Sequence, residues 1–208
     1  FQALITQANQ LKVPIERLDR SALDQMCFAA KHQGCILLHD GFDVAEDHLL
    51  SIVEAYGSKT RILILAHIQD PHNLGACLRT ACAAGVHAVV LTKHDSCALT
   101  ETVAKVASGA VSHLSIFTVT NLGQTLIQLK EAGVWVYGLS EHAEVSLYQA
   151  SLGDHAMALM MGSEGSGLRK HLGQHCDYLL RIPTSAAMPS LNVSVATGIV
   201  LFECMKAT

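Results

Sequence analysis

The chain has 208 residues, of which 50% are hydrophobic and 15% charged, and its formal net charge is −4 at pH 7. This composition is typical of a compact folded protein and argues against disorder. The length allows one full domain together with a fragment of another. No apolar run approaches the roughly 20 residues that span a bilayer, so we expect no membrane segment. The negative charge counts against a simple nucleic-acid binder, because binding phosphates favours basic surfaces, so any RNA partner needs a local patch, a second subunit or a further domain.

The cysteines and histidines show no metal-binding spacing. The seven cysteines form no CxxC pair, and most lie among Ala, Leu and Val, which predicts buried thiols in a reducing compartment such as the cytoplasm. His72, His171 and His175 have no partner at HExxH spacing. His171 and His175 could share one helix face, where we expect them to be solvated. We therefore predict no metal.

Residues 1–40 differ in pattern from the rest of the chain. The chain starts at Phe1, without Met, a basic start or an apolar signal core, so we expect it to begin inside a longer protein. Ser21 is the expected N-cap of a short helix, and a short apolar strand is expected at 35–38. The acidic stretch at 40–47 predicts a linker within 41–60, followed by a helix near 48–56.

From residue 61 onward, short apolar runs alternate with longer helical patterns. Strands are predicted at 62–66, 88–91, 115–119, 134–137, 157–160 and 178–181, and helices at 74–84, 101–108, 122–132 and 191–205. Uniformly apolar strands separated by helices indicate an α/β fold, with a parallel sheet covered on both faces. Such sheets bind ligands beyond the carboxyl ends of their strands, so the loops there are the candidate site.

The first candidate loop follows the strand at 62–66 and leads into a helix. Asn73 stands where a helix N-cap is expected, and Gly75 allows close backbone approach. Arg79 lies six residues after Asn73, so both are predicted to face one side of the helix. An Arg among Ala, Cys and Leu is expected to meet a buried carboxylate or a ligand; an ordinary structural salt bridge is the alternative.

The second candidate loop is rich in glycine and follows the strand at 157–160. Gly162, Gly165 and Gly167 predict a tight turn that brings backbone amides close to a ligand. Glu164 would repel a phosphate, so it favours a hydrogen-bonding role or a cationic partner such as Arg79.

The third candidate loop runs from Ile182-Pro183 to the final helix. Ser190 is the expected N-cap of that helix. Asn192 and Ser194 are then polar residues inside an apolar helix, where they are unfavourable, and this suggests a function beyond capping.

In this order the three loops resemble the three motifs of the SpoU/TrmH (SPOUT) RNA 2′-O-methyltransferases. The matching residues are Asn73-x-Gly75-x-x-x-Arg79, Gly162-x-Glu164-Gly165-x-Gly167, and Ile182-Pro183 with Ser190-Leu191-Asn192-Val193-Ser194. The likeness is closest to the bacterial enzymes that methylate a guanosine ribose in 23S ribosomal RNA. It departs from the family's Ile-Pro-Met-x-Gly at Thr184 and Ala186, and Ala cannot adopt every conformation of glycine.

The resemblance implies a fold, a cofactor and partners. The fold is a methyltransferase domain over 61–208 with a carboxyl-terminal trefoil knot, preceded in 1–40 by the remnant of a small α+β RNA-binding domain that includes His32-Gln33-Gly34. The cofactor is S-adenosylmethionine, bound by the residues Gly138, Leu139, Ser140, Gly162, Ile182 and Leu191. The implied partners are large-subunit ribosomal RNA and a second copy in a homodimer.

The resemblance also implies the catalytic residues. Arg79 is the family's candidate to assist the ribose 2′-hydroxyl, with Asn73, Glu164, Ser190 and Asn192 orienting it or the ribose. Since the guanidinium pKa is roughly 12 or more, we expect Arg79 to hold a phosphate and stabilise negative charge rather than accept a proton. The alternatives are a transfer-RNA ribose methyltransferase of the same family, a non-catalytic RNA-binding or ribosome-assembly factor, and an unrelated nucleotide-binding α/β enzyme.

Overall fold

The computed structural model describes residues 1–27, 32–38, 48–150, 152, 154–163 and 167–206. By its contacts the chain divides into two compact units, Phe1–Gly41 and Phe42–Thr208. No helix in the described ranges is long and apolar enough to cross a membrane. The predicted linker at 40–47 lies outside the described residues.

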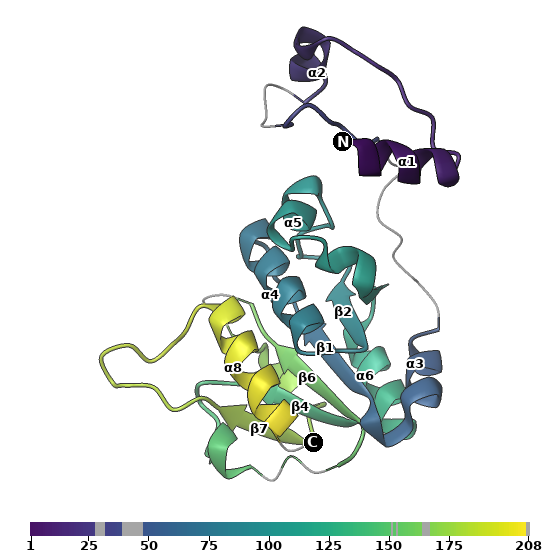
Figure 1. Cartoon of the computed structure of the whole chain (residues 1–208). Helices are drawn as coiled ribbons and strands as arrows, with labels where there is room; N and C mark the ends of the chain where they lie inside the picture. The colour runs from purple at the N-terminus through teal and green to yellow at the C-terminus, as the bar shows by residue number, and fades with distance from the viewer. Residues whose placement is uncertain (28–31, 39–47, 151, 153, 164–166, 207–208) are drawn as a thin grey trace. The chain divides into compact units, whose positions relative to one another are not determined.

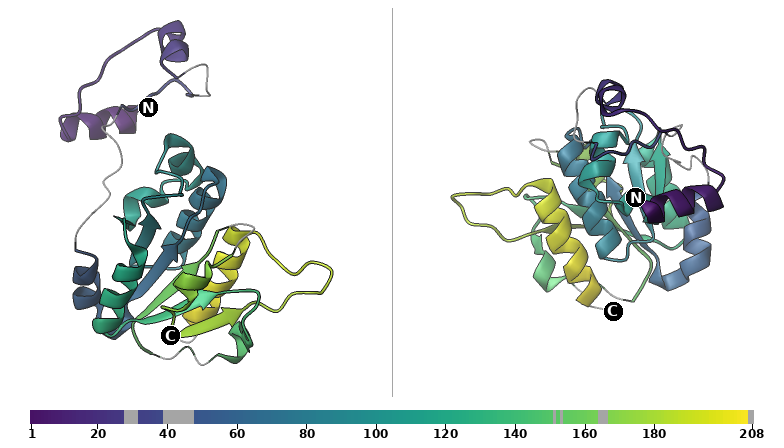
Figure 2. Two further views of the ribbon diagram at one scale, coloured as in Figure 1. Left: turned by 180° about the vertical axis from the view of Figure 1, so that it is seen from behind. Right: turned by 45° about the horizontal axis from the view of Figure 1, so that its top comes forward.

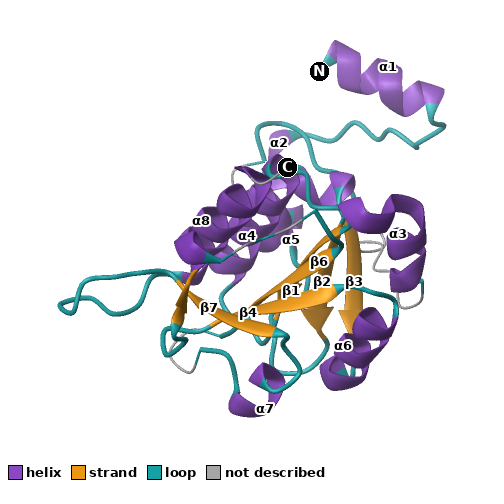
Figure 3. Ribbon diagram, turned by 90° about the horizontal axis from the view of Figure 1, so that it is seen from below, coloured by secondary structure: helices purple, strands orange, loops and turns teal. Residues whose placement is uncertain are grey.

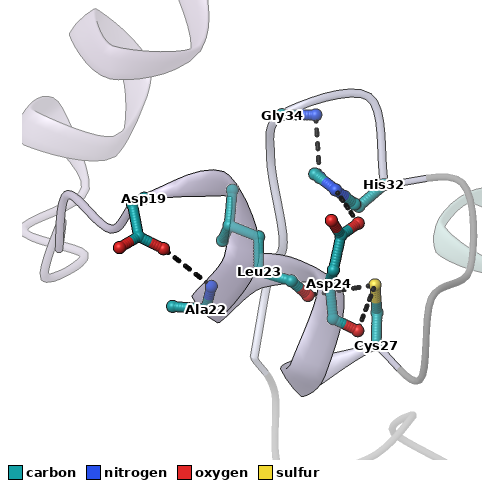
Figure 4. A network of polar contacts seen from close by, with 7 residues as sticks. All are labelled: Asp19, Ala22, Leu23, Asp24, Cys27, His32 and Gly34. Atoms are coloured by element: carbon teal, nitrogen blue, oxygen red, sulfur yellow. Dashed lines mark hydrogen bonds and ion pairs between the residues drawn. The ribbon is translucent and has the colours of Figure 1, made fainter.

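The first unit contains two short helices, α1 (Gln2–Gln10) and α2 (Arg20–Met26). Asp19, not Ser21, caps α2, because its carboxylate accepts a hydrogen bond from the amide of Ala22 at 2.8 Å. Figure 4 shows how His32 is held in the turn that follows. Its Nε2 lies 3.1 Å from Oδ1 of Asp24, and its Nδ1 accepts from the amide of Gly34 at 2.9 Å. These contacts hold the turn directly before the segment at 35–38, where a strand was predicted.

The expected strand at 35–38 is wrong, since these residues form neither helix nor strand. A strand needs a partner for its backbone groups, and the described part of the first unit offers no other strand. The role of residues 1–40 as the remnant of an RNA-binding domain stays a prediction.

The second unit is a parallel seven-stranded sheet with helices on both faces (Figure 1). The strands are β1 (Arg61–Leu65), β2 (Ala88–Thr92), β3 (Ser115–Val119), β4 (Trp135–Leu139), β5 (Val145–Ser146), β6 (Met157–Met161) and β7 (Tyr178–Arg181). Their order across the sheet is β3-β2-β1-β6-β4-β7-β5, and every pairing is parallel. The α/β prediction is therefore confirmed, whereas the knot stays a prediction.

Helices pack on both faces of this sheet (Figure 3). They are α3 (Leu49–Tyr56), α4 (Pro71–Ala83), α5 (Glu101–Val106), α6 (Leu122–Glu131), α7 (Lys170–Gly173) and α8 (Val193–Lys206), with short 3-10 turns at Gly57–Lys59, Ala110–His113 and Leu147–Gln149. Side chains alternate between two cores: Leu63 and Leu65 pack with α4, α5 and α8, while Ile62 and Ile64 pack with α3 and α6. Burial of both faces explains why the strands are apolar throughout.

The strands and long helices predicted from residue 61 onward all form, with ends within about three residues of those expected. The sequence did not predict helix α1, the two-residue edge strand β5, the single-turn helix α7 or the short 3-10 turns. A long loop, 182–192, joins β7 to α8 and projects from the sheet in each view of Figure 2.

Candidate functional site

The main candidate site is a pocket of about 560 Å³ beyond the carboxyl ends of β6, β4 and β7, which we call the carboxyl-edge pocket. Three chain segments form it: the turn after β4, the glycine loop after β6 and the loop between β7 and α8. Its lining includes predicted site residues from each segment: Leu139, Ser140, Gly162, Ile182, Ser190, Leu191 and Asn192. A pocket of this size, in the range of roughly 300–1,000 Å³, suits a small molecule.

Gly162 allows the glycine loop to fold back against itself. A Cβ on Gly162 would lie 2.2 Å from the carbonyl carbon and oxygen of Gly167, so no other residue fits without moving backbone. The amide of Gly167 donates to the carbonyl of Ser163 at 2.9 Å, which closes the loop, and Gly167 adopts a φ of +59°. Glu164 and Gly165 lie outside the described residues, so the catalytic role of Glu164 stays a prediction.

The third loop carries internal bonds that hold its shape. The hydroxyl of Thr184 donates to the carbonyl of Pro189 at 2.9 Å, and the amide of Met188 donates to the carbonyl of Ser185 at 3.1 Å. A methionine at position 184 could not make the first of these bonds. Ala186 is not among the described residues with positive φ, so alanine is compatible with the loop here.

Asn73 and Asn192 join the first and third motifs directly. Nδ2 of Asn192 donates to Oδ1 of Asn73 at 2.9 Å, and these residues are 119 positions apart in the chain. Asn73 is buried in the first turn of α4 and is not its N-cap; Asp70 caps the helix by accepting from the amide of His72. Asn73 therefore bonds to Asn192, directly before α8, in place of the capping role that we expected for it.

The cap of α8 also differs from the prediction. Oδ1 of Asn192 accepts from the amide and the hydroxyl of Ser194, so Asn192 and not Ser190 caps the helix, which begins at Val193. Capping thus explains why a polar residue stands at position 194 and explains one of the two bonding roles of the Asn192 side chain. It leaves Ser190, in the wall of the pocket, without a structural role among the bonds described.

Arg79 lies apart from the pocket. It is exposed, and its Nη1 donates to the hydroxyl of Ser108 at 3.3 Å, near the end of α5. Six helical residues turn the chain by about 600°, which leaves Arg79 about 120° around the axis from Asn73. The expectation that both residues face one side of the helix is therefore wrong, and no buried carboxylate meets Arg79 in the described structure.

Gly138 supports the pocket from beneath and does not line it. A Cβ there would lie 2.6 Å from Sγ of Cys176 and 2.8 Å from Cδ2 of Leu168. Burial raises the pKa of the Cys176 thiol to about 12, so this group packs as a neutral thiol. The structure thus brings together five of the six residues predicted for cofactor binding, together with Ser190 and Asn192.

Several lining residues were not predicted, including Glu141, His142, Thr184 and Met188. Glu141 and His142 directly follow β4, and their position at the end of a parallel strand was the signal that could have found them. Of the described lining residues, Glu141 alone is an acid, and none is Lys or Arg. Over the described ranges, no group of three or more His, Cys, Asp or Glu is placed to hold a metal ion.

The fold and the pocket define a class of protein: a parallel α/β domain that binds a small ligand in loops at the carboxyl edge of its sheet. Residues 60–202 match the model of the SpoU rRNA Methylase family. The chain belongs to this family, and the resemblance inferred from the three motifs is confirmed.

Known proteins with similar sequences and structures agree. The chain is 43% identical to a 23S rRNA (guanosine-2′-O-)-methyltransferase of Xanthomonas campestris over 96% of this chain and 80% of that protein. An AdoMet-bound rRNA methyltransferase from Sinorhizobium meliloti is similar in structure, with a TM-score of 0.65 and 29% identity; the match covers 71% of this chain and 56% of that one. A TrmH/SpoU tRNA modifying enzyme of A. aeolicus has a TM-score of 0.65 and 26% identity, over 72% of this chain and 75% of that one.

Proposed function

We propose that this chain uses S-adenosylmethionine to methylate the ribose 2′-hydroxyl of a guanosine in 23S ribosomal RNA. The observation that carries the proposal is the carboxyl-edge pocket, in which residues of the second and third motifs meet and to which Asn73 of the first is bonded through Asn192. The similarity over nearly the whole chain to a 23S rRNA guanosine methyltransferase supports this substrate.

The described residues of the pocket fit this cofactor. S-adenosylmethionine carries a sulfonium cation, and the described lining holds one acid, Glu141, and no Lys or Arg to repel that cation. The glycine at position 162 lets the glycine loop pack against the backbone of Gly167, and this tight fold forms one wall of the pocket. When bound, the cofactor would supply an activated methyl group, so the protein mainly has to align the acceptor hydroxyl.

The side chains have separate tasks in this proposal. Leu139, Ser140, Gly162, Ile182 and Leu191 hold the cofactor, largely through backbone and apolar contacts. Ser190 and Asn192 orient the ribose, and Asn73 fixes the amide of Asn192 through their hydrogen bond. Arg79 holds a phosphate of the RNA and stabilises negative charge as the hydroxyl reacts; Glu164 assists in orienting these groups.

The position of Arg79 favours a homodimer. Arg79 is exposed and lies outside the pocket of its own chain. It can therefore act in one of two ways: the RNA spans the distance from Arg79 to that pocket, or Arg79 serves the pocket of a second copy. Exposed apolar side chains on α8, Val195 at 52% and Phe202 at 49%, offer a surface for such a copy. We place the enzyme in the cytoplasm, where ribosomal RNA is modified.

The test combines cofactor binding with methyl transfer. Gel filtration first establishes a folded dimer, and calorimetric titration with S-adenosylmethionine then measures its Kd. Leu191→Trp should weaken binding at least about tenfold by filling the pocket, whereas Leu50→Trp on α3, at a nearly equal exposure (38% against 39%), should not. A folded dimer that does not bind the cofactor would contradict the proposal and favour a non-catalytic RNA-binding factor.

Methyl transfer then identifies the substrate. Unmodified transcripts of 23S rRNA and of bulk tRNA are incubated with the chain and labelled cofactor, and the labelled nucleoside is identified after digestion. We expect 2′-O-methylguanosine from the 23S transcript alone. If the label appears in the tRNA and not in the 23S transcript, the substrate is tRNA and the proposal is wrong. The A. aeolicus tRNA modifying enzyme, which is 26% identical, represents this alternative.

A further inference from the structure

A second cleft, of about 530 Å³, lies beyond the carboxyl ends of β1, β2 and β3. Its lining holds four imidazoles and one guanidinium, so we call it the imidazole cleft: His67, His94, Arg169, His171 and His175. His67 follows β1, His94 follows β2, and the other three lie around α7. The fold thus gathers these side chains from three separate segments.

The cleft and the carboxyl-edge pocket are neighbours along one edge of the sheet. Strand β1 pairs with β6, so the loops after the two strands lie side by side. Two consecutive residues also join the two sites, since Leu168 lines the pocket and Arg169 lines the cleft. The cleft therefore adjoins the place where a polymer would present its ribose to the pocket.

The charged residues that line the two sites differ in sign: Glu141 lines the carboxyl-edge pocket and Arg169 lines the imidazole cleft. No Asp or Glu is among the described lining residues of the cleft, which present hydrogen-bond donors on imidazole and guanidinium groups. Asp95 lies beside the cleft, where its Oδ2 accepts a hydrogen bond from Nη2 of Arg169 at 3.1 Å. The Arg169 and Asp95 side chains are 42% and 58% exposed, so water competes with this ion pair and an incoming anion can replace the carboxylate.

Hydrogen bonds fix the cleft's loops but leave ring atoms available to a ligand. The amide of His67 donates to the hydroxyl of Thr92 at 3.0 Å, and its Nδ1 lies 3.3 Å from the carbonyl of His94. These contacts hold the loops after β1 and β2 together. The histidines are not arranged as a metal site, because no suitable cluster of three occurs among the described residues.

We propose that the imidazole cleft binds the phosphodiester backbone of the RNA beside the nucleotide that is methylated. This inference rests on the proposed function and adds to it a binding site for the substrate, held by Arg169, His67, His94, His171 and His175. It explains how a chain with a net charge of −4 holds a polyanion: the favourable groups are concentrated in one cleft next to the reaction site.

The experiment measures binding of unmodified 23S rRNA transcript to the full chain at several salt concentrations. Arg169→Gln should weaken binding about tenfold near 0.1 M salt, as expected for loss of one charge-assisted hydrogen bond. It should also lower the slope of log K against log salt by about 0.7–0.9, the value for one phosphate contact. His171→Gln, at an exposed position, should weaken binding by a smaller factor without endangering the fold.

Two further variants make the test sharper. Asp95→Asn removes the carboxylate that competes for Arg169 and should tighten RNA binding about two- to fivefold. Lys59→Gln removes an exposed cation before β1, at the opposite edge of the sheet, and should leave RNA binding unchanged. The Kd for S-adenosylmethionine and the thermal midpoint should stay at wild-type values in all four variants.

The outcomes separate this inference from the proposed function. If the wild-type chain methylates the transcript and Arg169→Gln binds RNA as tightly as wild type, the cleft does not bind the backbone, although the proposed function stands. An equal loss in Lys59→Gln would also overturn the inference, since it would show a general effect of charge. If the wild-type chain binds neither the cofactor nor RNA, both proposals fail.

Discussion

The two ends of the motif on α4, Asn73 and Arg79, lie in different surroundings. At the first turn of this helix, Asn73 is buried and bonded to Asn192, which lines the carboxyl-edge pocket. Farther along, Arg79 is exposed and bonded to Ser108, outside the pocket. Both residues belong to one motif, and about 9 Å of helix axis lies between them.

This difference separates cofactor binding from the chemistry of the acceptor. The walls of the pocket come from one chain, and Asn73 reaches them through a hydrogen bond within that chain. The guanidinium of Arg79 is instead presented to solvent, where RNA or a second copy can meet it. The two ends should therefore respond differently to substitution, one in cofactor binding and stability and the other in methyl transfer.

Gly162→Ala tests the pocket and should have the largest effect. The new Cβ would lie 2.2 Å from the backbone of Gly167, so the loop must move, and binding of S-adenosylmethionine should fall below detection in calorimetry. Gly198→Ala on α8 is the matched control, because its Cβ would lie 3.7 Å from Thr80 in ordinary contact. Unchanged binding in Gly162→Ala would show that the glycine loop does not hold the cofactor.

Arg79→Ala tests the other end of α4. Methyl transfer to 23S rRNA should fall at least about a hundredfold, because a group that stabilises developing charge is lost. The Kd for S-adenosylmethionine should stay within about twofold of wild type, since Arg79 does not line the pocket. The measurements are single-turnover transfer of labelled methyl and calorimetric titration.

Ser108→Ala is the control for Arg79. It removes the hydrogen-bond partner at 3.3 Å and leaves the guanidinium in place, so activity should be nearly unchanged. Equal losses of activity in the two variants would indicate that Arg79 acts through its contact with α5. Equal loss of cofactor binding and transfer in Arg79→Ala would refute the division between the two ends of the helix.

The sequence was a good guide to the sheet and to the order of the motifs, and a poor guide to tertiary contacts. Strands such as β1 and β6 are buried on both faces, so their uniform apolar character identified them. The edge strand β5 has two residues and leaves no pattern to detect. The segment at 35–38 has the composition of a strand but no partner in the described part of its unit.

The candidate site shows the same division. Gly162, Ile182 and Leu191 lie in loops whose position follows from the strands before them, and all three line the pocket. By contrast, Asn73 and Asp70 are both plausible helix caps in sequence, and a bond to a residue 119 positions away decides the role of Asn73. The imidazole cleft combines segments far apart in sequence, so spacing could not predict it.

Asn73→Ala tests how much the buried hydrogen bond at the first turn of α4 contributes to the stability of the fold. It removes the acceptor for Nδ2 of Asn192 and should lower the free energy of unfolding by about 1–2 kcal/mol. Asn73→Asp keeps an acceptor oxygen at this position and should recover part of the loss. Urea unfolding followed by circular dichroism provides the values. Equal destabilisation by Asp and Ala would indicate that the hydrogen bond to Asn192 does not stabilise α4 against α8.

The smallest effect concerns His87, which lies outside α4 and directly precedes β2. Its Nδ1 accepts from the amide of Arg61 at 3.0 Å, and its ring stacks on Tyr56 with centroids 3.8 Å apart. Burial, and then the charge of Arg61, lowers the pKa of His87 from its ordinary value of 6.5. The folded chain therefore takes up a proton here at lower pH than the unfolded chain does.

It follows that His87 lowers stability only on the acid side. Well above pH 6.5 the ring is neutral in both states and contributes no pH dependence. As the pH falls through 6.5, the unfolded chain binds the proton first, and unfolding becomes more favourable. His87→Asn keeps an acceptor for the Arg61 amide but cannot titrate, so its urea midpoint should fall less than that of wild type between pH 7 and pH 5.5. Parallel midpoints would mean that this ring does not titrate on unfolding. Because His87 belongs to neither end of α4, the variant should leave methyl transfer at pH 7.5 unchanged, which confines this pH effect to folding and keeps it separate from the chemistry assigned to Asn73 and Arg79.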